Sequence, residues 1–283
     1  MITAMDARAT LLETPALTLE LLRCRVGRDP SPPSHTAKRQ VVFPLVGTFR
    51  WHVGSEMSLL DPNHVMFVET DEESWDTHST PTDLTLLIAT VAAPTAHRLW
   101  RSPRPFRERV ARISPRLQTQ QMWLASAIRP GAPAVWEERV LDLLAAATAE
   151  AGEPPLPPSS RAAAALARRA KELFADRGEL IALAELAELL DVSPAHLTDS
   201  FRRAEGVPIV RYQIQLRLAR ALRELPTAND LAALAVGLGF ASHSHFSTAF
   251  RAHTGLTPSQ YRAAARRGDG IERIRKRALA ASG

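Results

Sequence analysis

The chain has 283 residues, of which 45% are hydrophobic and 23% are charged, with a formal net charge of +5. This length predicts about two domains, each able to bury a core, and the composition is too apolar for a largely disordered chain. A single cysteine, Cys24, excludes an internal disulfide framework and a CxxC zinc or redox centre.

The N-terminal segment mixes acidic residues with apolar ones, since Asp6, Glu13 and Glu20 all fall within it. A secretory signal peptide has a basic segment followed by an apolar one, so we expect no export signal. The longest apolar run, residues 84–93, is about half of the roughly 20 residues needed to span a bilayer. We therefore predict a cytoplasmic protein that has no membrane partner.

The N-terminal half changes character along its length. Residues 40–93 contain short segments rich in Val, Phe, Ile and Thr between turn-forming residues, which predicts a small antiparallel barrel or sandwich. Residues 116–150 have apolar residues at helical spacing on both sides of an RPGAP break, which predicts a helical hairpin. The apolar stripe from Leu117 to Leu144 either packs within its domain or forms a dimer seam. We favour the seam, because a two-helix hairpin often leaves an apolar face uncovered.

Residues 151–160, AGEPPLPPSS, contain four prolines, which predicts an extended spacer between two domains. The chain is charged differently on its two sides. Residues 161–283 hold 19 Lys and Arg against 12 Asp and Glu, whereas residues 1–160 hold 16 against 18. A basic half joined to a slightly acidic half favours a phosphate-binding module fused to a sensing or assembly module.

The basic half repeats itself at an offset of 49 residues, and its two copies predict two helix-turn-helix units. Each copy has an apolar helix, a tight turn and a second helix, with Ser193 and Ser242 as N-caps and Gly206 and Gly255 just past the end. The matched pairs are Ala184 with Ala233, Leu189 with Leu238, Ser193 with Ser242, His196 with His245, Leu197 with Phe246, Phe201 with Phe250, Arg202 with Arg251, Gly206 with Gly255, and Tyr212 with Tyr261.

A single helix is predicted between the two units, from Pro208 to Pro226. At 1.5 Å per residue it would be roughly 27 Å long. A strut of that length would hold the two second helices about one turn of duplex apart, roughly 34 Å, so that both enter successive major grooves.

Residues 217–222 read RLARAL and residues 234–262 read LAVGLGFASHSHFSTAFRAHTGLTPSQYR. Over about residues 161–267 the chain resembles the AraC/XylS family of transcription regulators. The resemblance implies partners of four kinds: double-stranded promoter DNA, RNA polymerase, a small effector and a second copy of the chain. It implies no cofactor.

The resemblance also implies an α+β protein with two domains. Residues 1–150 are expected to form a cupin-like antiparallel β-barrel with a helical hairpin, which binds an effector or dimerises. The linker, residues 151–160, would lead into an all-α DNA-binding domain with two helix-turn-helix units, residues 161–267. Residues 268–283 would form a basic tail.

The family's DNA-reading positions fall on the second helix of each unit. In the first unit they are Ala195, Thr198, Asp199, Arg202 and Arg203, and in the second unit they are His243, Ser244, His245, Ser247, Thr248 and Arg251. Because Arg251 repeats Arg202, we expect both to bind phosphate. Asp199 would either accept a hydrogen bond from cytosine or pair with a neighbouring arginine. A metal pair of His243 and His245 is excluded, because residues two apart on a helix point in different directions.

In the barrel, Trp51, His64 and Trp75 are the candidate effector contacts, although core filling explains each of them more simply. The alternative function is a metal-dependent cupin enzyme fused to the DNA-binding module. Such an enzyme needs an HxH motif, a carboxylate and a further histidine, whereas the histidines here are scattered at His35, His52, His64 and His78. A repair methyltransferase would need several cysteines. We therefore predict a protein that is not an enzyme and holds no metal.

Overall fold

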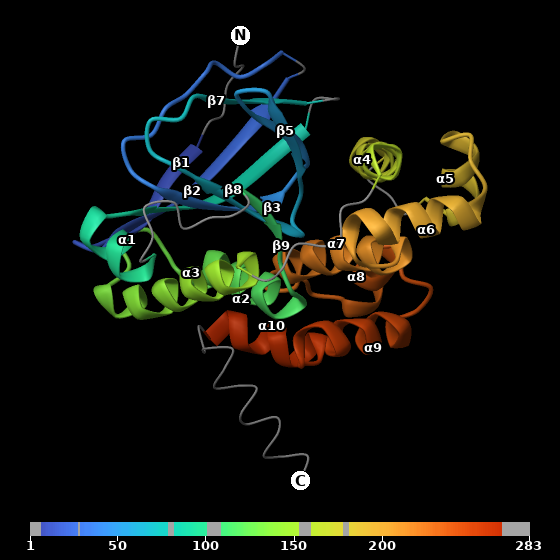
Figure 1. Ribbon diagram of the computed structural model, residues 1–283. Helices are drawn as coiled ribbons and strands as arrows, with labels where there is room; N and C mark the ends of the chain where they lie inside the picture. The colour runs from blue at the N-terminus through green and yellow to red at the C-terminus, as the bar shows by residue number, and fades with distance from the viewer. Residues whose placement is uncertain are drawn as a thin grey trace.

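The computed structural model describes residues 7–27, 29–78, 82–100, 109–152, 160–177 and 181–267. An N-terminal barrel of two antiparallel sheets lies beside a C-terminal set of helices, and a helical hairpin lies under the barrel (Figure 1). This arrangement confirms the predicted α+β class. Of the predicted segments, most of the linker (153–159) and the whole basic tail (268–283) lie outside the described residues.

The barrel is built from a larger and a smaller sheet. The order of the larger sheet is β1 (Ala7–Glu13), β2 (Leu17–Val26), β8 (Thr82–Val91), β3 (Gln40–Val46), β6 (His64–Val68) and β9 (Val110–Arg112). The order of the smaller sheet is β5 (Glu56–Leu60), β4 (Phe49–Val53) and β7 (Ser74–Thr77). Pro44 cannot donate a backbone hydrogen bond, and the register of β3 against β8 shifts between Pro44 and Val46.

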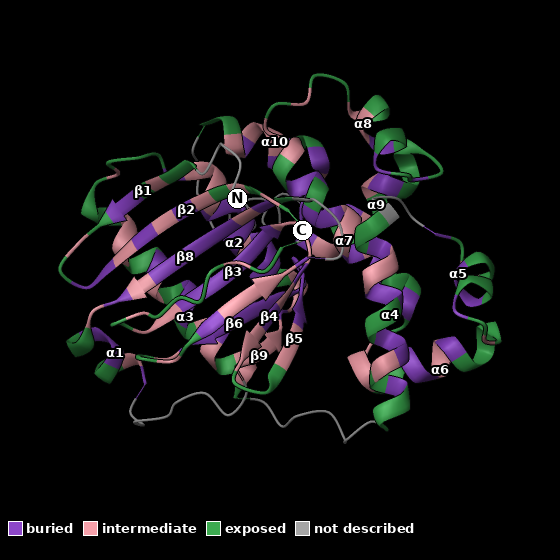
Figure 2. Ribbon diagram, turned by 90° about the horizontal axis from the view of Figure 1, so that it is seen from above, coloured by how far each residue is buried: buried purple, intermediate pink, exposed green. Residues whose placement is uncertain are grey.

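The larger sheet has two apolar faces, because successive side chains along a strand point to opposite sides. On β2, Leu19 and Leu21 belong to the core that contains the helical hairpin, whereas Leu22 packs on the core between the sheets. The inner core also contains Phe49 and Trp51 from β4. Strands β8, β3 and β6 are therefore buried along most of their length (Figure 2).

The hairpin consists of α2 (Pro115–Ala127), a short 3-10 turn (Ala134–Trp136) and α3 (Glu137–Ala151), and α1 (Ala93–Leu99) follows the last long strand. Most of its apolar stripe is packed inside the chain, so these residues are not available for the dimer seam that the sequence favoured. Seven of them are at most 4% exposed: Leu117, Met122, Trp123, Leu124, Val140, Leu143 and Leu144. Val135, in the 3-10 turn, is 74% exposed. The larger sheet and the last helices of the chain cover the stripe.

The C-terminal helices are α4 (Arg161–Arg177), α5 (Leu183–Leu189), α6 (Pro194–Glu205), α7 (Ile209–Glu224), α8 (Leu231–Gly237), α9 (His243–Thr254) and α10 (Pro258–Arg267). The first unit is α5 with α6, and the second unit is α8 with α9. Helix α7 is the predicted strut, which begins directly after Pro208. Within the described residues no helix is long and apolar enough to cross a membrane.

The two units are held by different cores. The first unit has a core of its own, in which Phe174 of α4 and Phe201 of α6 meet Tyr212 of α7. The second unit shares one continuous core with the hairpin and the larger sheet, to which α9 contributes Phe246 and Phe250. The second unit is therefore joined to the N-terminal domain by apolar packing.

Candidate DNA-binding surface and its attachment to the barrel

Helix α6 is fixed at both ends by local sequence. The hydroxyl oxygen of Ser193 accepts a hydrogen bond from the backbone N–H of His196 at 3.2 Å, and Pro194 occupies the first helical turn. Gly206 ends the helix at φ 72°, a left-handed conformation that glycine adopts without strain. Leu197 and Phe201 are 0% exposed, so they hold one face of α6 in the core and leave the opposite face to solvent.

Helix α9 repeats this construction. The hydroxyl oxygen of Ser242 accepts from the backbone N–H of His245 at 3.1 Å, and Gly255 ends the helix at φ 77°. Phe246 and Phe250 are 0% exposed, in the same positions as their counterparts on α6. Both units thus present a capped second helix with one buried and one open face, as the repeat predicts.

The predicted DNA-reading residues of α6 lie on its open face, but its charges are already paired. Ala195, Arg202 and Arg203 are exposed. One carboxylate oxygen of Asp199 lies 2.6 Å from Arg203, and the other lies 3.7 Å from Arg202. The hydroxyl of Thr198 donates to the carbonyl of Pro194 at 2.8 Å. Two arginines therefore share one carboxylate, which halves the positive charge that this face offers to phosphate.

The open face of α9 carries no carboxylate. Its exposed residues are His243, Ser244, His245, Thr248 and Arg251, and Ser247 is half-buried. The ring of His245 packs edge-on against Phe240 at 5.5 Å between centroids. Hydroxyls and imidazoles can donate or accept hydrogen bonds, so this face is suited to base edges as well as phosphates.

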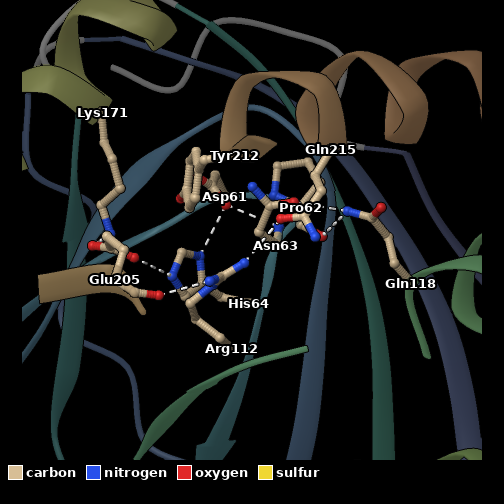
Figure 3. A network of polar contacts seen from close by, with 10 residues as sticks. All are labelled: Asp61, Pro62, Asn63, His64, Arg112, Gln118, Lys171, Glu205, Tyr212 and Gln215. Carbon is tan, nitrogen blue, oxygen red and sulfur yellow. Dashed lines mark hydrogen bonds and ion pairs between the residues drawn. The ribbon is translucent and has the colours of Figure 1, made fainter. Parts of the chain in front are cut away.

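A buried polar cluster joins the barrel to the first unit (Figure 3). Asp61 lies in the turn between β5 and β6, and its carboxylate accepts the hydroxyl of Tyr212 from α7. The same carboxylate lies 2.9 Å from Nδ1 of His64 and accepts the backbone N–H of Asn63 at 2.9 Å. Asp61 is 2% exposed and His64 is 4% exposed. The carboxylate is thus enclosed and surrounded by donors.

These neighbours determine the ionisation of Asp61 and Tyr212. Burial alone would raise the pKa of the Asp61 carboxyl, but the charge and hydrogen bond of His64, the charge of Lys171 and the Tyr212 hydroxyl together hold that pKa well below its usual range. Burial and the adjacent Asp61 charge raise the pKa of Tyr212 well above its ordinary value. At neutral pH Asp61 is therefore a charged acceptor and Tyr212 is a neutral donor.

The end of α6 is attached to the same cluster. Glu205, its last residue, lies 2.9 Å from the ammonium of Lys171 on α4 and 3.9 Å from Nε2 of His64. The Glu205 carbonyl accepts from the guanidinium of Arg112 on β9 at 2.7 Å. Arg112 also donates to the side chain of Gln215 on α7 at 2.9 Å. The second helix of the first unit is thus held at its C-terminal end by side chains from the barrel.

Two further contacts extend the attachment. The side-chain amide of Gln118, on α2, donates to the carbonyl of Pro62 at 2.8 Å and to Asn63 at 3.0 Å, which links the hairpin to the cluster. A guanidinium nitrogen of Arg50, on the smaller sheet, lies 2.7 Å from the Glu172 carboxylate of α4. The cluster was not predicted from the sequence. Its signals were a turn sequence, DPN, and a tyrosine that the repeat already marked as a matched position.

The three candidate effector contacts do not come together. Trp51 is 5% exposed in the core between the sheets, and His64 belongs to the polar cluster. Trp75 lies stacked on His52, with 5.2 Å between centroids and 2° between planes. Core packing accounts for the first of them and the interdomain cluster for the second.

Parts of the chain are similar in sequence to known proteins. Residues 186–264 match a family model described as a helix-turn-helix domain. The bifunctional transcriptional activator/DNA repair enzyme AdaA of Bacillus subtilis (strain 168) is 32% identical over 85 residues, which are 30% of this chain and 40% of AdaA. The HTH-type transcriptional activator AarP of Providencia stuartii is 31% identical over 83 residues, which are 29% of this chain and 62% of AarP. The chain thus spans only part of the length of these curated relatives.

Solved structures show weaker likenesses. Apo ToxT, as a variant from Vibrio cholerae, aligns with 88% of this chain and 98% of its own, at a TM-score of 0.39 and 12% identity. A cupin superfamily protein from Desulfitobacterium hafniense aligns with 31% of this chain and 77% of its own, at a TM-score of 0.27 and 11% identity.

Two capped helix-turn-helix units on one central helix define the C-terminal half as a DNA-binding domain. The family match and the two relatives make it a helix-turn-helix domain of the AraC type, which confirms the resemblance seen in the sequence motifs.

Proposed function

We propose that the chain is a transcription regulator that binds promoter DNA with both helix-turn-helix units, each entering one of two adjacent major grooves. The observation that carries this proposal is the repeated open face of α6 and α9, which is polar and is not covered by the barrel. Each of these two helices is capped by a serine. A two-unit reader contacts more phosphates and more base edges than a single helix, so it gains both affinity and sequence selectivity.

The two units are proposed to contribute unequally. Arg251 of α9 binds phosphate without a carboxylate on its own helix, so the second unit anchors the protein. On α6, Asp199 is engaged by Arg202 and Arg203. The first unit therefore binds phosphate more weakly. It favours half-sites with a base that can donate a hydrogen bond to a carboxylate, such as cytosine.

The barrel is proposed to control how the DNA-binding domain is presented. Its contacts with both units support this role, through the apolar core at the second unit and the polar cluster at the first. A small effector, or association with a second copy of the chain, would shift this arrangement and so change promoter occupancy or contact with RNA polymerase.

We propose a binding protein without catalysis. His64 has a carboxylate at each ring nitrogen, Asp61 at Nδ1 and Glu205 near Nε2, and these carboxylates bind Tyr212 and Lys171 respectively. A cluster whose charged groups bind one another at the domain interface is suited to holding the domains together.

The test is a selection of genomic DNA fragments with the full chain, followed by affinity measurements at several salt concentrations. The expected result is a shared sequence with two half-sites one helical turn apart, bound with an affinity that falls steeply as salt rises. An Arg251→Ala variant should lose affinity, whereas Arg98→Ala on α1, outside the DNA-binding domain, should not. Recovery of no common sequence, or an unchanged affinity for Arg251→Ala, would refute the proposal.

A further inference from the structure

A cavity of about 720 Å³ lies where the barrel, the hairpin and the DNA-binding domain meet. One wall comes from β2, β3 and β8 of the larger sheet, a second from the C-terminal half of α2, and a third from the end of α7 and the turn after it. Volumes of roughly 300 to 1,000 Å³ are typical of sites for small organic molecules. The cavity is therefore large enough for an effector that touches all three parts.

Part of the lining is apolar and buried. Leu21 of β2 and Leu45 of β3 are each 6% exposed, and Met122 of α2 is 3% exposed. Ala125 adds a small side chain one turn further along α2. Methionine adapts its shape easily, so this lining can pack against the hydrocarbon or aromatic part of a ligand.

The lining also carries several positive charges. Four exposed arginines line the cavity, two from β2, one just after α2 and one near the end of α7: Arg23, Arg25, Arg129 and Arg223. The lining contains one carboxylate, Asp83, which lies 4.0 Å from Arg25, with both side chains largely exposed. A second carboxylate, Glu224 beside the lining, lies 3.1 Å from Arg223, so positive charge still exceeds negative charge here. Arginine presents planar donors that match carboxylates, sulfonates and phosphates. Excess positive charge beside a buried apolar wall fits a molecule with one anionic end and one apolar end.

We propose that this cavity binds a small organic anion, whose acidic group contacts the arginines and whose apolar part lies on the wall formed by Leu21, Leu45 and Met122. The regulatory consequence rests on the proposed function. Arg23 belongs to the barrel and Arg223 to the strut that carries both helix-turn-helix units, so a bound anion bridges the two domains. A ligand bound in the cavity therefore changes the affinity of the chain for DNA. Bound DNA must in turn change the affinity for the ligand by the same factor.

The experiment uses two fluorescent probes with the same aromatic body. Anilinonaphthalene sulfonate carries an anionic group, and phenylnaphthylamine lacks it. The full chain is expected to bind the sulfonate at one saturable site, about 10-fold more tightly than the uncharged probe. Arg23→Gln, Arg129→Gln and Arg223→Gln should each weaken sulfonate binding about 3- to 10-fold and leave the uncharged probe unaffected.

Arg98→Gln is the matched control, because this exposed arginine on α1 does not line the cavity. It removes the same charge and should leave sulfonate binding unchanged. Equal affinity for the two probes, or a loss with Arg98→Gln as large as with the cavity variants, would overturn the inference. Circular dichroism of each variant confirms that the fold is retained.

Coupling is measured as the affinity for a selected DNA site with and without saturating sulfonate. The expected result is a change of at least about 5-fold, which disappears in Arg223→Gln. An unchanged DNA affinity would overturn the coupling. A chain that binds the sulfonate in this charge-dependent way but binds no DNA would refute the proposed function alone. DNA binding without charge-dependent probe binding would refute only this inference.

Discussion

Tyr212 of α7 donates its hydroxyl to the carboxylate of Asp61 in the barrel, across 151 positions of the chain. Tyr261, the matched residue of the second unit, is also 0% exposed, and its ring packs edge-on against Phe250 as that of Tyr212 does against Phe201. Its hydroxyl, however, has no such hydrogen-bond partner within the described residues. The same residue of the repeat therefore has different surroundings in the two copies. The first unit is attached to the barrel by polar contacts and the second by apolar packing.

We expect the contact between Asp61 and Tyr212 to stabilise the full chain. Tyr212→Phe deprives a buried carboxylate of one donor and should lower the free energy of unfolding by about 1–3 kcal/mol. Asp61→Asn should cost a similar amount. Because the two side chains share one interaction, the double variant should lose at least about 0.5 kcal/mol less than the sum of the single losses. Urea unfolding followed by circular dichroism measures all three, and simple additivity would contradict the coupling.

Acid should weaken this contact in a defined direction. The folded-state pKa of Asp61 lies below its ordinary value of 3.8, so its contribution to stability is complete above that pH and is lost as the pH falls below it. The stability difference between the wild type and Asp61→Asn should thus shrink below pH 3.8, by up to about 1.4 kcal/mol per pH unit. Asp76, whose pKa is also lowered, is present in both chains and cancels. A constant difference down to about pH 2.5 would refute this prediction.

The helix-turn-helix units could be predicted from the sequence because their signals are local. Ser193 and Ser242 cap the helices that follow them, and Gly206 and Gly255 end those helices at positive φ. Each signal acts within one or two helical turns, and each occurs in both copies of the repeat. The prolines that bound the strut are equally local, so its limits were also predictable.

The domain interface could not be predicted, because it depends on contacts between distant positions. The turn that contains Asp61 has ordinary turn chemistry, and nothing near it in the sequence points to Tyr212. The stripe from Leu117 to Leu144 shows the same limitation. Its periodicity predicts an apolar face correctly, but it cannot tell whether the cover comes from a second chain or from the larger sheet and the last helices of its own chain.

The serine cap of α9 offers a test with an internal control. Ser242→Ala removes the hydroxyl that accepts the backbone N–H of His245 and should cost about 1 kcal/mol. Ser244→Ala, two residues further on, removes an exposed hydroxyl of the proposed DNA-reading face. It should leave stability within about 0.5 kcal/mol of the wild type. Thermal unfolding without DNA separates the two, and equal losses would contradict the capping role.

The unequal charges of α6 and α9 predict different effects on DNA recognition. Arg251→Ala should weaken binding to all sequences by a similar factor and reduce the salt dependence by about one phosphate contact. Asp199→Ala releases Arg202 and Arg203 from their shared carboxylate, so it should mainly change the base preference of one half-site. Competition between randomised half-sites measures both effects. Uniform changes across all sequences for both variants would contradict the proposed asymmetry.

The continuous core predicts that the DNA-binding half depends on the barrel. In a fragment of residues 160–283, the faces of α7, α9 and α10 that pack against α2 would be exposed to water. Burial of apolar surface contributes about 25 cal/mol per Å², so loss of this cover should lower the thermal midpoint and promote self-association.

The first unit has its own core and should resist hydrogen exchange longer than the second unit in this fragment. Calorimetry, sedimentation and hydrogen exchange measure these effects. A monomeric fragment with the midpoint of the full chain, or faster exchange in the first unit, would show that the shared core adds no stability.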